Sequence, residues 1–301
     1  MSVSVAMITG RGSANTPNPV VRVLACLLLA FGVSVSAPAA LAKPSRIVSI
    51  NLCTDDLLLR MADREAIASV TWLSRDPASS NVADIAATIP VNHGLAEEVM
   101  SYHPDLVVAG IYTSRTAVAL LKRVGLNVVE FGVPRTFDEV RADIRRMAEV
   151  IGEPARGEAM VARFDARLAQ LTREGETRHF GAIVLRPNGF TVGKNSLVND
   201  ILSVSGLENM ALRLKFESFL QIPLEAVALQ HADILILNGD KSSAPSLATE
   251  ALSHPIIQDL STRLVRLSVP SKLWTCAGPS NLDAINRLID ATADIARDPR
   301  P

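Results

Sequence analysis

One segment of this chain occurs twice, and the repeat limits what the chain can fold into. Leu95–Gly110 is echoed by Pro223–Gly239. Three residue pairs, each 128 positions apart, anchor the match: Glu97 and Glu225, His103 and His231, and Asp105 and Asp233. Each copy predicts a short helix opened by Glu, a turn at Asp and a fully apolar strand. We therefore expect two lobes of similar design.

The stretch between the two copies predicts how the lobes are joined. Helical periodicity runs from Phe137 to Ile151, pauses at Gly152–Pro154 and resumes to about Thr172. Pro154 is tolerated as the first residue of a new helix, where its missing amide hydrogen costs little. A helix of about twenty residues spans roughly 30 Å, and the low Gly, Pro and Ser content indicates a stiff connection. Such a connection predicts a cleft between two lobes rather than a single core.

Within each lobe, strands alternate with short helices, which is typical of a parallel sheet covered on both faces. The first lobe opens with the strand Arg46–Ile50 and the helix Asp55–Met61, which Thr54 or Asp55 can cap. The second lobe opens with the strand Gly181–Leu185 and continues to the helix Leu197–Val204. The adjacent pair Asp55–Asp56 is interpreted as a helix start, because neighbouring helical residues do not face each other as an acid–base dyad would.

The amino end has the pattern of a cleaved export signal. Arg11 and Arg22 precede the apolar run Val23–Val35, and Ala40–Ala42 fits the small-x-small cleavage pattern. The run is shorter than the ~20 apolar residues of a membrane span. A lipoprotein reading of Cys26 is disfavoured, since no apolar core separates it from the arginine before it. The predicted organisation is a signal peptide over 1–42, an N-terminal lobe over 43–152, a linking helix over 153–175 and a C-terminal lobe over 176–301.

Composition excludes some classes of partner. The chain of 301 residues is 48% apolar and 20% charged, as in packed globular proteins. Its 30 Lys and Arg balance 31 Asp and Glu, so nucleic acid and anionic membrane surfaces are not expected as main partners. The two cysteines of the mature chain, Cys53 and Cys276, form either a disulfide or two separate thiols, because spacing alone does not decide. Neither belongs to a metal-binding CxxC pair.

The order and spacing of several motifs carry a family resemblance over nearly the whole mature chain. They are the first strand, Glu97 with His103–Val108, Gly193-x-x-Ser196-Leu197, Gly206-x-x-Asn209, and Trp274. In this order the chain resembles the periplasmic substrate-binding proteins for vitamin B12, ferric siderophores and haem that feed ABC importers. The resemblance implies an α/β fold of two Rossmann-like lobes, each a mostly parallel sheet flanked by helices, joined by one long backbone helix with the ligand cleft between them.

Loops at the carboxyl ends of the strands are expected to line that cleft, since open α/β sheets generally bind ligands there. The candidate ligand-binding residues are Asn51, Cys53, Trp72, Arg75, Tyr112, Arg186, Phe190, Trp274 and Cys276. Aromatic faces would suit a flat, partly apolar ligand, and arginines would meet its carboxylates or amide oxygens. The alternative for Trp72 and Trp274 is a pair of core side chains that close the strand ends.

The resemblance also implies a docking role for Glu97 and Glu225. Family members similar to the B12-binding protein present one acidic residue on each lobe to arginines of the permease. Two exposed carboxylates at matching positions can orient a two-lobed protein over a two-fold partner. The alternative is that each carboxylate only stabilises the amino end of its helix.

The function implied is capture of a bulky metal chelate in the periplasm and its delivery to an importer. A corrinoid is the first expectation and a ferric siderophore or haem the next; for haem, Tyr112 or His93 is the candidate axial ligand. The partners implied are the permease dimer with its cytoplasmic ATPase. The protein is expected to be a monomer, cleaved after Ala42, with no cofactor, metal site or catalytic residue of its own.

Two other functional classes are compatible with the sequence. One is an exported α/β enzyme such as a hydrolase, although the sequence contains no G-x-S-x-G elbow, phosphate-binding loop, H-E-x-x-H helix or Gly-rich dinucleotide turn. The other is a receptor for bare metal ions, which would need three or four converging donors. His93, His179 and His254 show no ligand spacing with one another, and His103 and His231 are expected to end their helices.

Overall fold

The computed structural model describes residues 43–214, 220–223, 225, 226, 231–238, 255, 257 and 264–297. The predicted signal peptide, 1–42, and His254 lie outside the described residues. Within the described part, no helix combines the length and the apolar character that crossing a membrane would require.

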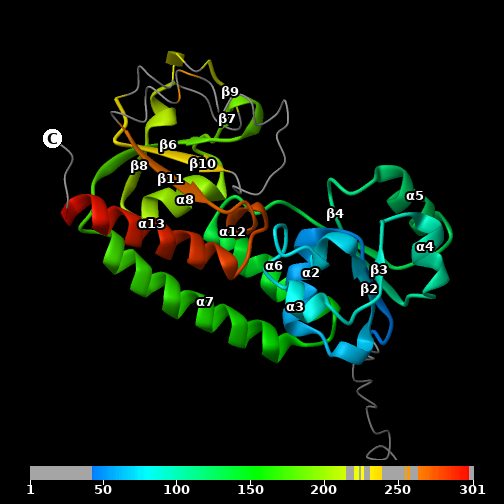
Figure 1. Cartoon of the computed structure of the whole chain (residues 1–301). Coiled ribbons are helices and arrows are strands. Elements are labelled where there is room, and N and C mark those ends of the chain that lie inside the picture. Colours follow the sequence, from blue (N-terminus) through cyan, green and yellow to red (C-terminus); the bar gives the residue numbers. More distant parts are fainter. Residues whose placement is uncertain are drawn as a thin grey trace, which may run out of the picture. The chain divides into compact units, whose positions relative to one another are not determined.

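The first lobe is built on a five-stranded parallel sheet, with the order β3-β2-β1-β4-β5 (Figure 1). Its strands are β1 (Ile47–Ser49), β2 (Ile67–Thr71), β3 (Val91–Asn92), β4 (Leu106–Gly110) and β5 (Val128–Phe131). Its helices are α2 (Leu52–Met61), α3 (Ala83–Ala86), α4 (Ala96–Ser101) and α5 (Arg115–Arg123), with short 3-10 turns η1 (Arg64–Ala66) and η2 (Trp72–Arg75). The fully buried strand β4 reads as a continuous apolar run because helices cover both faces of the sheet.

The second lobe repeats this plan. Its four-stranded parallel sheet has the order β11-β10-β6-β8. A separate antiparallel ribbon of two strands, β7 and β9, belongs to the same lobe. The strands are β6 (Phe180–Leu185), β7 (Phe190–Thr191), β8 (Leu207–Asn209), β9 (Leu220–Gln221), β10 (Ile234–Asn238) and β11 (Val265–Val269). The helices are α8 (Leu197–Val204), α12 (Lys272–Thr275) and α13 (Ser280–Arg297), with 3-10 turns η3 (Pro187–Gly189) and η4 (Met210–Leu214). The predicted fold class, two α/β lobes with parallel sheets, is confirmed.

The repeated segment occupies the same place in both lobes. Its strand is β4 in the first lobe and β10 in the second, and each lies directly beside the opening strand of its own sheet, β1 or β6. The histidine before it has a positive φ in both copies, 48° at His103 and 47° at His231. A single residue in this left-handed conformation commonly ends a helix, and His103 directly follows the C-cap of α4, Tyr102.

The aspartate of each copy clamps the neighbouring strand. Asp105 accepts hydrogen bonds from the amides of Ser45 (2.7 Å) and Arg46 (3.0 Å) and from the Ser45 hydroxyl (2.9 Å). Asp233 accepts one from the amide of Gly181 (2.7 Å). Both amino-terminal strand ends would otherwise leave these amides without a partner in the sheet. The Asp of each repeat therefore fixes the amino end of the opening strand of its sheet, β1 or β6.

Asn51 corrects the expected start of the first helix. The structure begins α2 at Leu52, with the Asn51 side chain accepting hydrogen bonds from the amides of Cys53 (2.9 Å) and Thr54 (3.4 Å) as the N-cap. Thr54 and Asp55 lie inside the helix and are buried. The prediction failed because an Asx, Thr, Asp run offers several residues that can cap, and the chain uses the earliest one.

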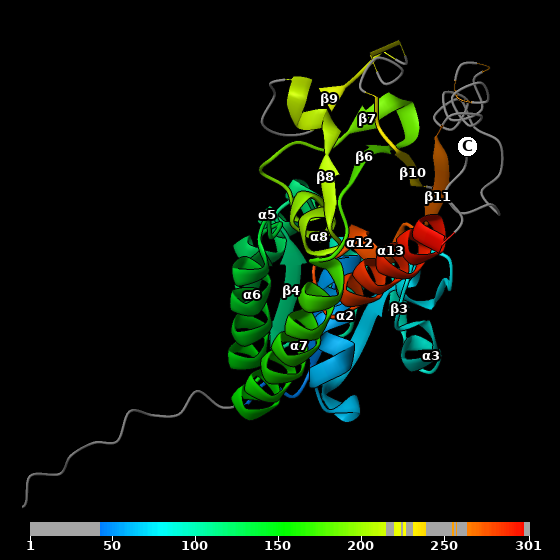
Figure 2. The same cartoon turned by 90° about the vertical axis from the view of Figure 1, so that its left-hand side faces the viewer.

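Two helices connect the lobes. α6 (Phe137–Val150) is followed by α7 (Pro154–Gly175), which begins at the proline that the sequence predicted. The 22 residues of α7 give it a length of roughly 33 Å, and it runs beside α6 and α13 (Figure 2). Arg156 of α7 donates to the carbonyl of Met61 (2.8 Å) and pairs with Asp63 (2.7 Å) in the first lobe. Arg167 binds Asn286 of α13 in the second.

The lobes share part of their apolar core, whereas the sequence predicted a cleft between them rather than a single core. One connected set of buried apolar side chains includes Leu58 of α2, Ile144 of α6, Phe164 and Leu171 of α7, and Ile285 of α13. Smaller separate clusters lie on the opposite faces of the two sheets. The apolar stripes of α7 and α13 are long enough to serve both lobes, so the apolar interior continues from one lobe into the other.

Removing the carboxylate of Asp105 should lower the free energy of unfolding more at neutral pH than at acid pH. Burial raises the pKa of Asp105, but its hydrogen bonds from Ser45 and Arg46 outweigh this and hold the pKa below its ordinary value. A lowered pKa stabilises the folded state above the unfolded pKa of about 4, and this is lost as the pH falls through the folded value.

We expect Asp105→Asn to lower the free energy of unfolding by about 1 kcal/mol at pH 7, with the difference from wild type shrinking below pH ~4. Urea unfolding across this pH range measures it. Asp138→Asn, at a side chain 93% exposed, is the matched control. Equal stability of wild type and Asp105→Asn at pH 7 would contradict the clamp.

Candidate functional site

The predicted ligand-binding residues lie at the carboxyl-terminal edges of the two parallel sheets. In the first lobe, Asn51 follows β1, Trp72 and Arg75 follow β2, and Tyr112 follows β4. In the second, Arg186 follows β6, Phe190 opens β7, and Trp274 and Cys276 follow β11. The strand order places the three first-lobe loops side by side along one edge.

A disulfide ties these two edges together. Cys53, just after β1, is bonded to Cys276, just after β11, with 5.0 Å between the Cα atoms. The sequence had left open whether these cysteines pair. Cys53 lies in the first turn of α2 and Cys276 caps α12, so the bond ties the segment after β1 to the segment after β11. We call the junction between these two segments the interlobe seam.

Hydrogen bonds around α12 extend this interlobe seam. The side-chain amide of Asn81 donates to the carbonyl of Lys272 (2.6 Å), and the Lys272 ammonium donates to the carbonyl of Pro77 (2.9 Å). Arg60 donates to the Ser280 hydroxyl at the start of α13 (3.2 Å). The short segment between β11 and α13 is thus bound to the first lobe by side chains as well as by the disulfide.

The most exposed aromatic groups of the site lie on these edges. Trp72 is 50% exposed, Tyr112 79% and Phe190 38%. The indole of Trp72 lies 6.4 Å, centroid to centroid, from the ring of His93, which follows β3. Four aromatic or imidazole rings therefore border the strand ends with part of their faces open.

His93 is oriented by a carboxylate. Its Nδ1 lies 3.0 Å from Oε1 of Glu98, and its backbone amide donates to Oε2 at 2.7 Å. These contacts with the amide and the ring lower the pKa of Glu98. The carboxylate occupies Nδ1, so Nε2 is the ring nitrogen left for another partner. The sequence named His93 without any sign of this support, because Glu98 is recognisable only once the loop before α4 is folded.

Other predicted residues are already occupied by structural contacts. The side-chain oxygen Oδ1 of Asn51 caps α2, and the same side chain lies against Gly110, where an added Cβ would come within 2.8 Å of Nδ2. Arg75 donates to the carbonyls of Ala86 (3.3 Å) and Ile89 at the end of α3. In this structure both side chains therefore make contacts that stabilise the edge.

Trp274 is placed in the core. It is 4% exposed and belongs to the connected core set shared by the lobes, and the disulfide partner Cys276 is 9% exposed. The alternative that the sequence left open, a core tryptophan at a strand end, describes this residue, whereas Trp72 has an open face. Arg186 is half-buried, and burial lowers the pKa of its guanidinium.

The two matched glutamates are exposed. Glu97 lies in the first turn of α4, and Glu225 is helical and exposed in the second copy of the repeat. The neighbouring carboxylate of Glu98 is not free, because it binds the backbone amide and the ring of His93. Glu97 is therefore the carboxylate of this turn that faces solvent.

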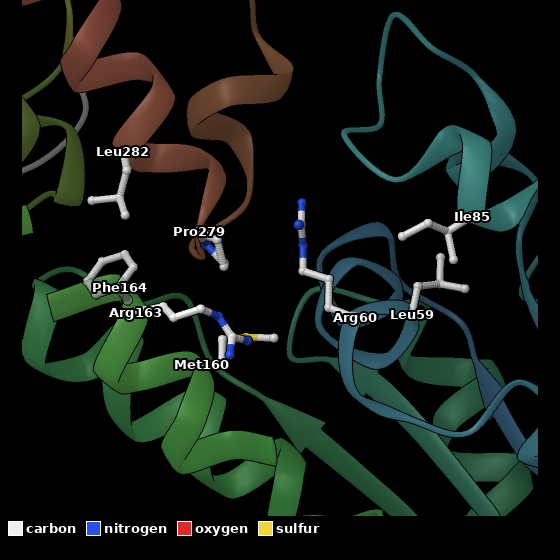
Figure 3. Close-up of a pocket in the computed structure, with 8 residues that line it drawn as sticks. All are labelled: Leu59, Arg60, Ile85, Met160, Arg163, Phe164, Pro279 and Leu282. Atoms are coloured by element: carbon white, nitrogen blue, oxygen red, sulfur yellow. The ribbon is translucent and has the colours of Figure 1, made fainter. Parts of the chain in front are cut away.

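A separate cavity lies between helices of the two lobes. It has a volume of about 360 Å³ and is bordered by the first-lobe helices α2 and α3 on one side and by α7 and the start of α13 on the other (Figure 3). Its lining residues are Leu59, Arg60, Ile85, Met160, Arg163, Phe164, Pro279 and Leu282. None of the predicted ligand-binding residues borders it.

The described residues offer binding surfaces rather than a metal centre. Among them, no group of three or more His, Cys, Asp or Glu is placed to hold a metal ion. What the two edges present is open aromatic faces, one carboxylate-oriented imidazole and a half-buried guanidinium. This set can stack on a flat ligand and meet its polar groups or a metal that the ligand carries.

Comparison with known proteins gives consistent matches. The sequence pattern of the family described as "Periplasmic binding protein" matches residues 47–262. A curated relative, the "Cobalamin-binding protein" of Halobacterium salinarum, is 22% identical over 226 residues. That alignment covers 71% of this chain and 60% of the relative, so the chain spans about three fifths of the relative's length.

Two solved structures show the same fold. The periplasmic haem-binding protein RhuT from Roseiflexus sp. RS-1, in its apo form, has a TM-score of 0.70 at 20% identity, covering 84% of this chain and 99% of that one. The periplasmic vitamin B12 binding protein BtuF of Vibrio cholerae has a TM-score of 0.65 at 16% identity, covering 85% and 99%.

Breaking the disulfide should cost stability without unfolding the protein. The bond closes a loop across a sequence separation of 223 residues, and long loops lose the most entropy in the unfolded chain. We expect Cys53→Ser with Cys276→Ser to lower the free energy of unfolding by about 2–5 kcal/mol, measured by urea unfolding. Dithiothreitol should lower the stability of wild type to that of the double variant and leave the variant unchanged. Two reactive thiols in oxidised, denatured wild type would contradict the bond.

Proposed function

Because the chain belongs to the periplasmic binding protein family, we propose that it captures a bulky metal chelate between its lobes and delivers it to the permease of an ABC importer. The single observation that carries this proposal is the Cys53–Cys276 disulfide, which joins the segments after β1 and β11, together with the exposed rings of Trp72, Tyr112 and Phe190 beyond strands of the two sheets. Ligands of open α/β sheets bind at such edges. A single sheet edge offers one wall, whereas this arrangement supplies two.

A corrinoid is the ligand proposed first. It is flat, partly apolar and edged by amide groups, so the indole of Trp72 and the ring of Phe190 can cover its faces while polar groups meet its rim. The curated relative from Halobacterium salinarum and the BtuF structure are both named for this ligand class. Ferric siderophores are bulky chelates of related size and stay in the same proposal as a further ligand class.

Haem is the second candidate, and one observation favours it specifically. The Glu98 carboxylate holds His93 by Nδ1 (3.0 Å) beside Trp72, so Nε2 is the nitrogen left to bind an iron atom carried by the ligand. A carboxylate on the second nitrogen fixes the tautomer and raises the basicity of a metal-binding imidazole. Tyr112, the other candidate axial ligand, is 79% exposed after β4.

Capture needs little movement on this proposal. The shared core, α7 and the disulfide hold the lobes in one arrangement, so the ligand surface is largely formed in advance and less ordering entropy is lost on binding. No catalytic step is involved. We place the protein in the periplasm after cleavage behind Ala42, an oxidising compartment where the Cys53–Cys276 bond persists, with the lobe limits 43–152 and 176–301 proposed on either side of the linking helix.

Delivery is assigned to Glu97 and Glu225. Both are exposed, and the repeat puts them at corresponding positions of the two lobes. Arginines on a two-fold permease can engage such a pair through charge-assisted hydrogen bonds. The pair lies outside the set of groups proposed to hold the ligand, so binding and delivery should be separable by mutation.

The ligand assignment is tested by titrating cyanocobalamin and haemin separately into the mature protein, following visible absorbance and tryptophan quenching. We expect saturable binding of one of them, and Trp72→Ala should weaken it about tenfold or more through loss of the stacked face. Val124→Ala, which shortens another half-exposed apolar side chain at the end of α5, should bind as wild type does. His93→Gln should shift the visible spectrum only if haem is the ligand. No binding of either compound, or of a ferric hydroxamate, would end the proposal.

The docking assignment is tested by uptake. Glu97→Ala and Glu225→Ala should leave the dissociation constant for the chelate unchanged and reduce its uptake about tenfold or more, because each removes a charge-assisted contact. The assay is uptake of labelled chelate by cells whose own copy is replaced by each variant. Glu208→Ala, at another exposed glutamate of the second lobe, is the control. Normal uptake with both docking residues replaced would show that the carboxylates only favour their helices.

A further inference from the structure

Asp55 is a buried acid without an ion-pair partner in the described part of the chain. It lies on the first turn of α2 and is 0% exposed. Its Oδ2 accepts hydrogen bonds from the amide of Thr71 (3.1 Å), the hydroxyl of Thr71 and the hydroxyl of Ser74. Its Oδ1 has no hydrogen-bond partner. Burying an ionised carboxylate costs folding free energy unless hydrogen bonds compensate for the lost water. The three hydrogen bonds to Oδ2 provide that compensation.

All of these contacts hold one loop. Thr71 ends β2 and Ser74 lies in the turn η2, so the two residues flank Trp72 on either side. The backbone and side-chain donors of the loop therefore meet at a single oxygen of α2. The side chain of Trp72 itself stays 50% exposed, so its direction depends on the backbone beneath it.

We propose that Asp55 is a positioning residue of the ligand site: its ionised carboxylate fixes the loop 71–74 and with it the face of Trp72, and its protonation loosens that loop. The inference rests on the proposed function, since Trp72 is the proposed stacking surface. Asp55 would act on the ligand site without contacting the ligand, and its protonation would make the loop 71–74 less ordered.

The surroundings of Asp55 favour a proton at mildly acidic pH. Burial raises its pKa to about 6, and the nearby hydroxyls of Ser49, Ser74 and Thr71 offset part of the effect of burial. The strands packed against α2, which are β1, β2 and β4, contain no charged residue, and the buried face of α6 is apolar. The charged groups nearest in the chain are engaged elsewhere, as the paired residues Asp56 and Arg60 and the carbonyl-bound Arg75 show.

Protonation weakens the hold for a simple reason. Hydrogen bonds to an ionised oxygen are roughly twice as strong as those to a neutral one. A proton on Oδ2 also competes with the three donors of the loop. In the linkage sense the native state takes up this proton more readily than the unfolded chain, so Asp55 itself favours folding more at pH 5 than at pH 7 while its grip on the loop declines.

The test follows the Thr71 amide by hydrogen exchange, without any ligand. In Asp55→Asn at pH 7 its protection should fall about tenfold, the effect of losing one hydrogen bond to a charged group. Wild type should show the same fall on acidification from pH 7 to pH 5, after correction for intrinsic exchange rates, while Val107 in β4 keeps its protection. Asp56→Asn removes a neighbouring charge that does not touch the loop and should behave as wild type.

Fluorescence gives a second readout on Trp72 itself. The chain has two tryptophans, so Trp274→Phe leaves Trp72 as the reporter, and His93→Gln removes the imidazole that lies beside it. Iodide quenching in this background should rise on acidification with a midpoint near pH 6, and Asp55→Asn should abolish the transition. Quenching and Thr71 exchange that do not depend on pH in the presence of Asp55 would overturn the proposal. If Asp55→Asn does not fold, the pH dependence of the background protein still decides.

A binding arm separates this proposal from the proposed function. Cyanocobalamin and haemin are titrated into wild type and Asp55→Asn at pH 7. Weaker binding by the variant supports the positioning role. Equal binding by both, with the loop loosened, contradicts it. Failure of both compounds to bind wild type defeats the proposed ligand but leaves the exchange result, and so the hold of Asp55 on the loop, to stand or fall separately.

Discussion

The packing of α7 against α6 of the first lobe and α13 of the second is the constraint on which the rest of the structure depends. Two small parallel sheets, each with short strands, bury limited apolar surface alone. Here one set of buried side chains continues from α2 through α6 and α7 to α13, and the Cys53–Cys276 bond adds a covalent link between the lobes. The two sheet edges are therefore held at a fixed separation. A ligand that fits this separation meets preformed walls, and one that does not gains little from lobe movement.

The sequence predicted the architecture well because the repeat and the linking helix are local patterns. The strand of each repeat and the start of α7 at Pro154 follow from short-range patterns. The hydrogen bonds of Asp105 and Asp233 to the neighbouring strand were not predicted, because they join residues more than fifty positions apart. The shared core was missed, since periodicity shows which face of a helix is apolar but not how many partners that face serves. The pairing of the two cysteines was undecidable for the same reason: a sequence separation of 223 contains no information about proximity.

The strand-end positions of the candidate residues were predictable, but their exposure and contacts were not. Strand ends were correctly identified as the place where the aromatic residues gather, but Trp274 and Trp72 look alike in the sequence and differ in exposure, 4% against 50%. Asp55 was read as part of a helix start because an acid after Asn and Thr usually is one. Only the folded chain shows that Asn51 is the N-cap of α2 and that Asp55 accepts hydrogen bonds from the loop after β2. Roles that depend on a partner distant in the sequence are the ones that pattern alone does not reveal.

The most direct test of the account is a crystal structure of the oxidised, mature protein grown with saturating cyanocobalamin and, in a second crystal, with haemin. The account predicts that one of them lies at the interlobe seam with its ring against Trp72 and Phe190, the Cys53–Cys276 bond intact, and Glu97 and Glu225 free of the ligand. Ring density in the cavity between Arg60 and Arg163, or on the outer surface of either lobe, would contradict it.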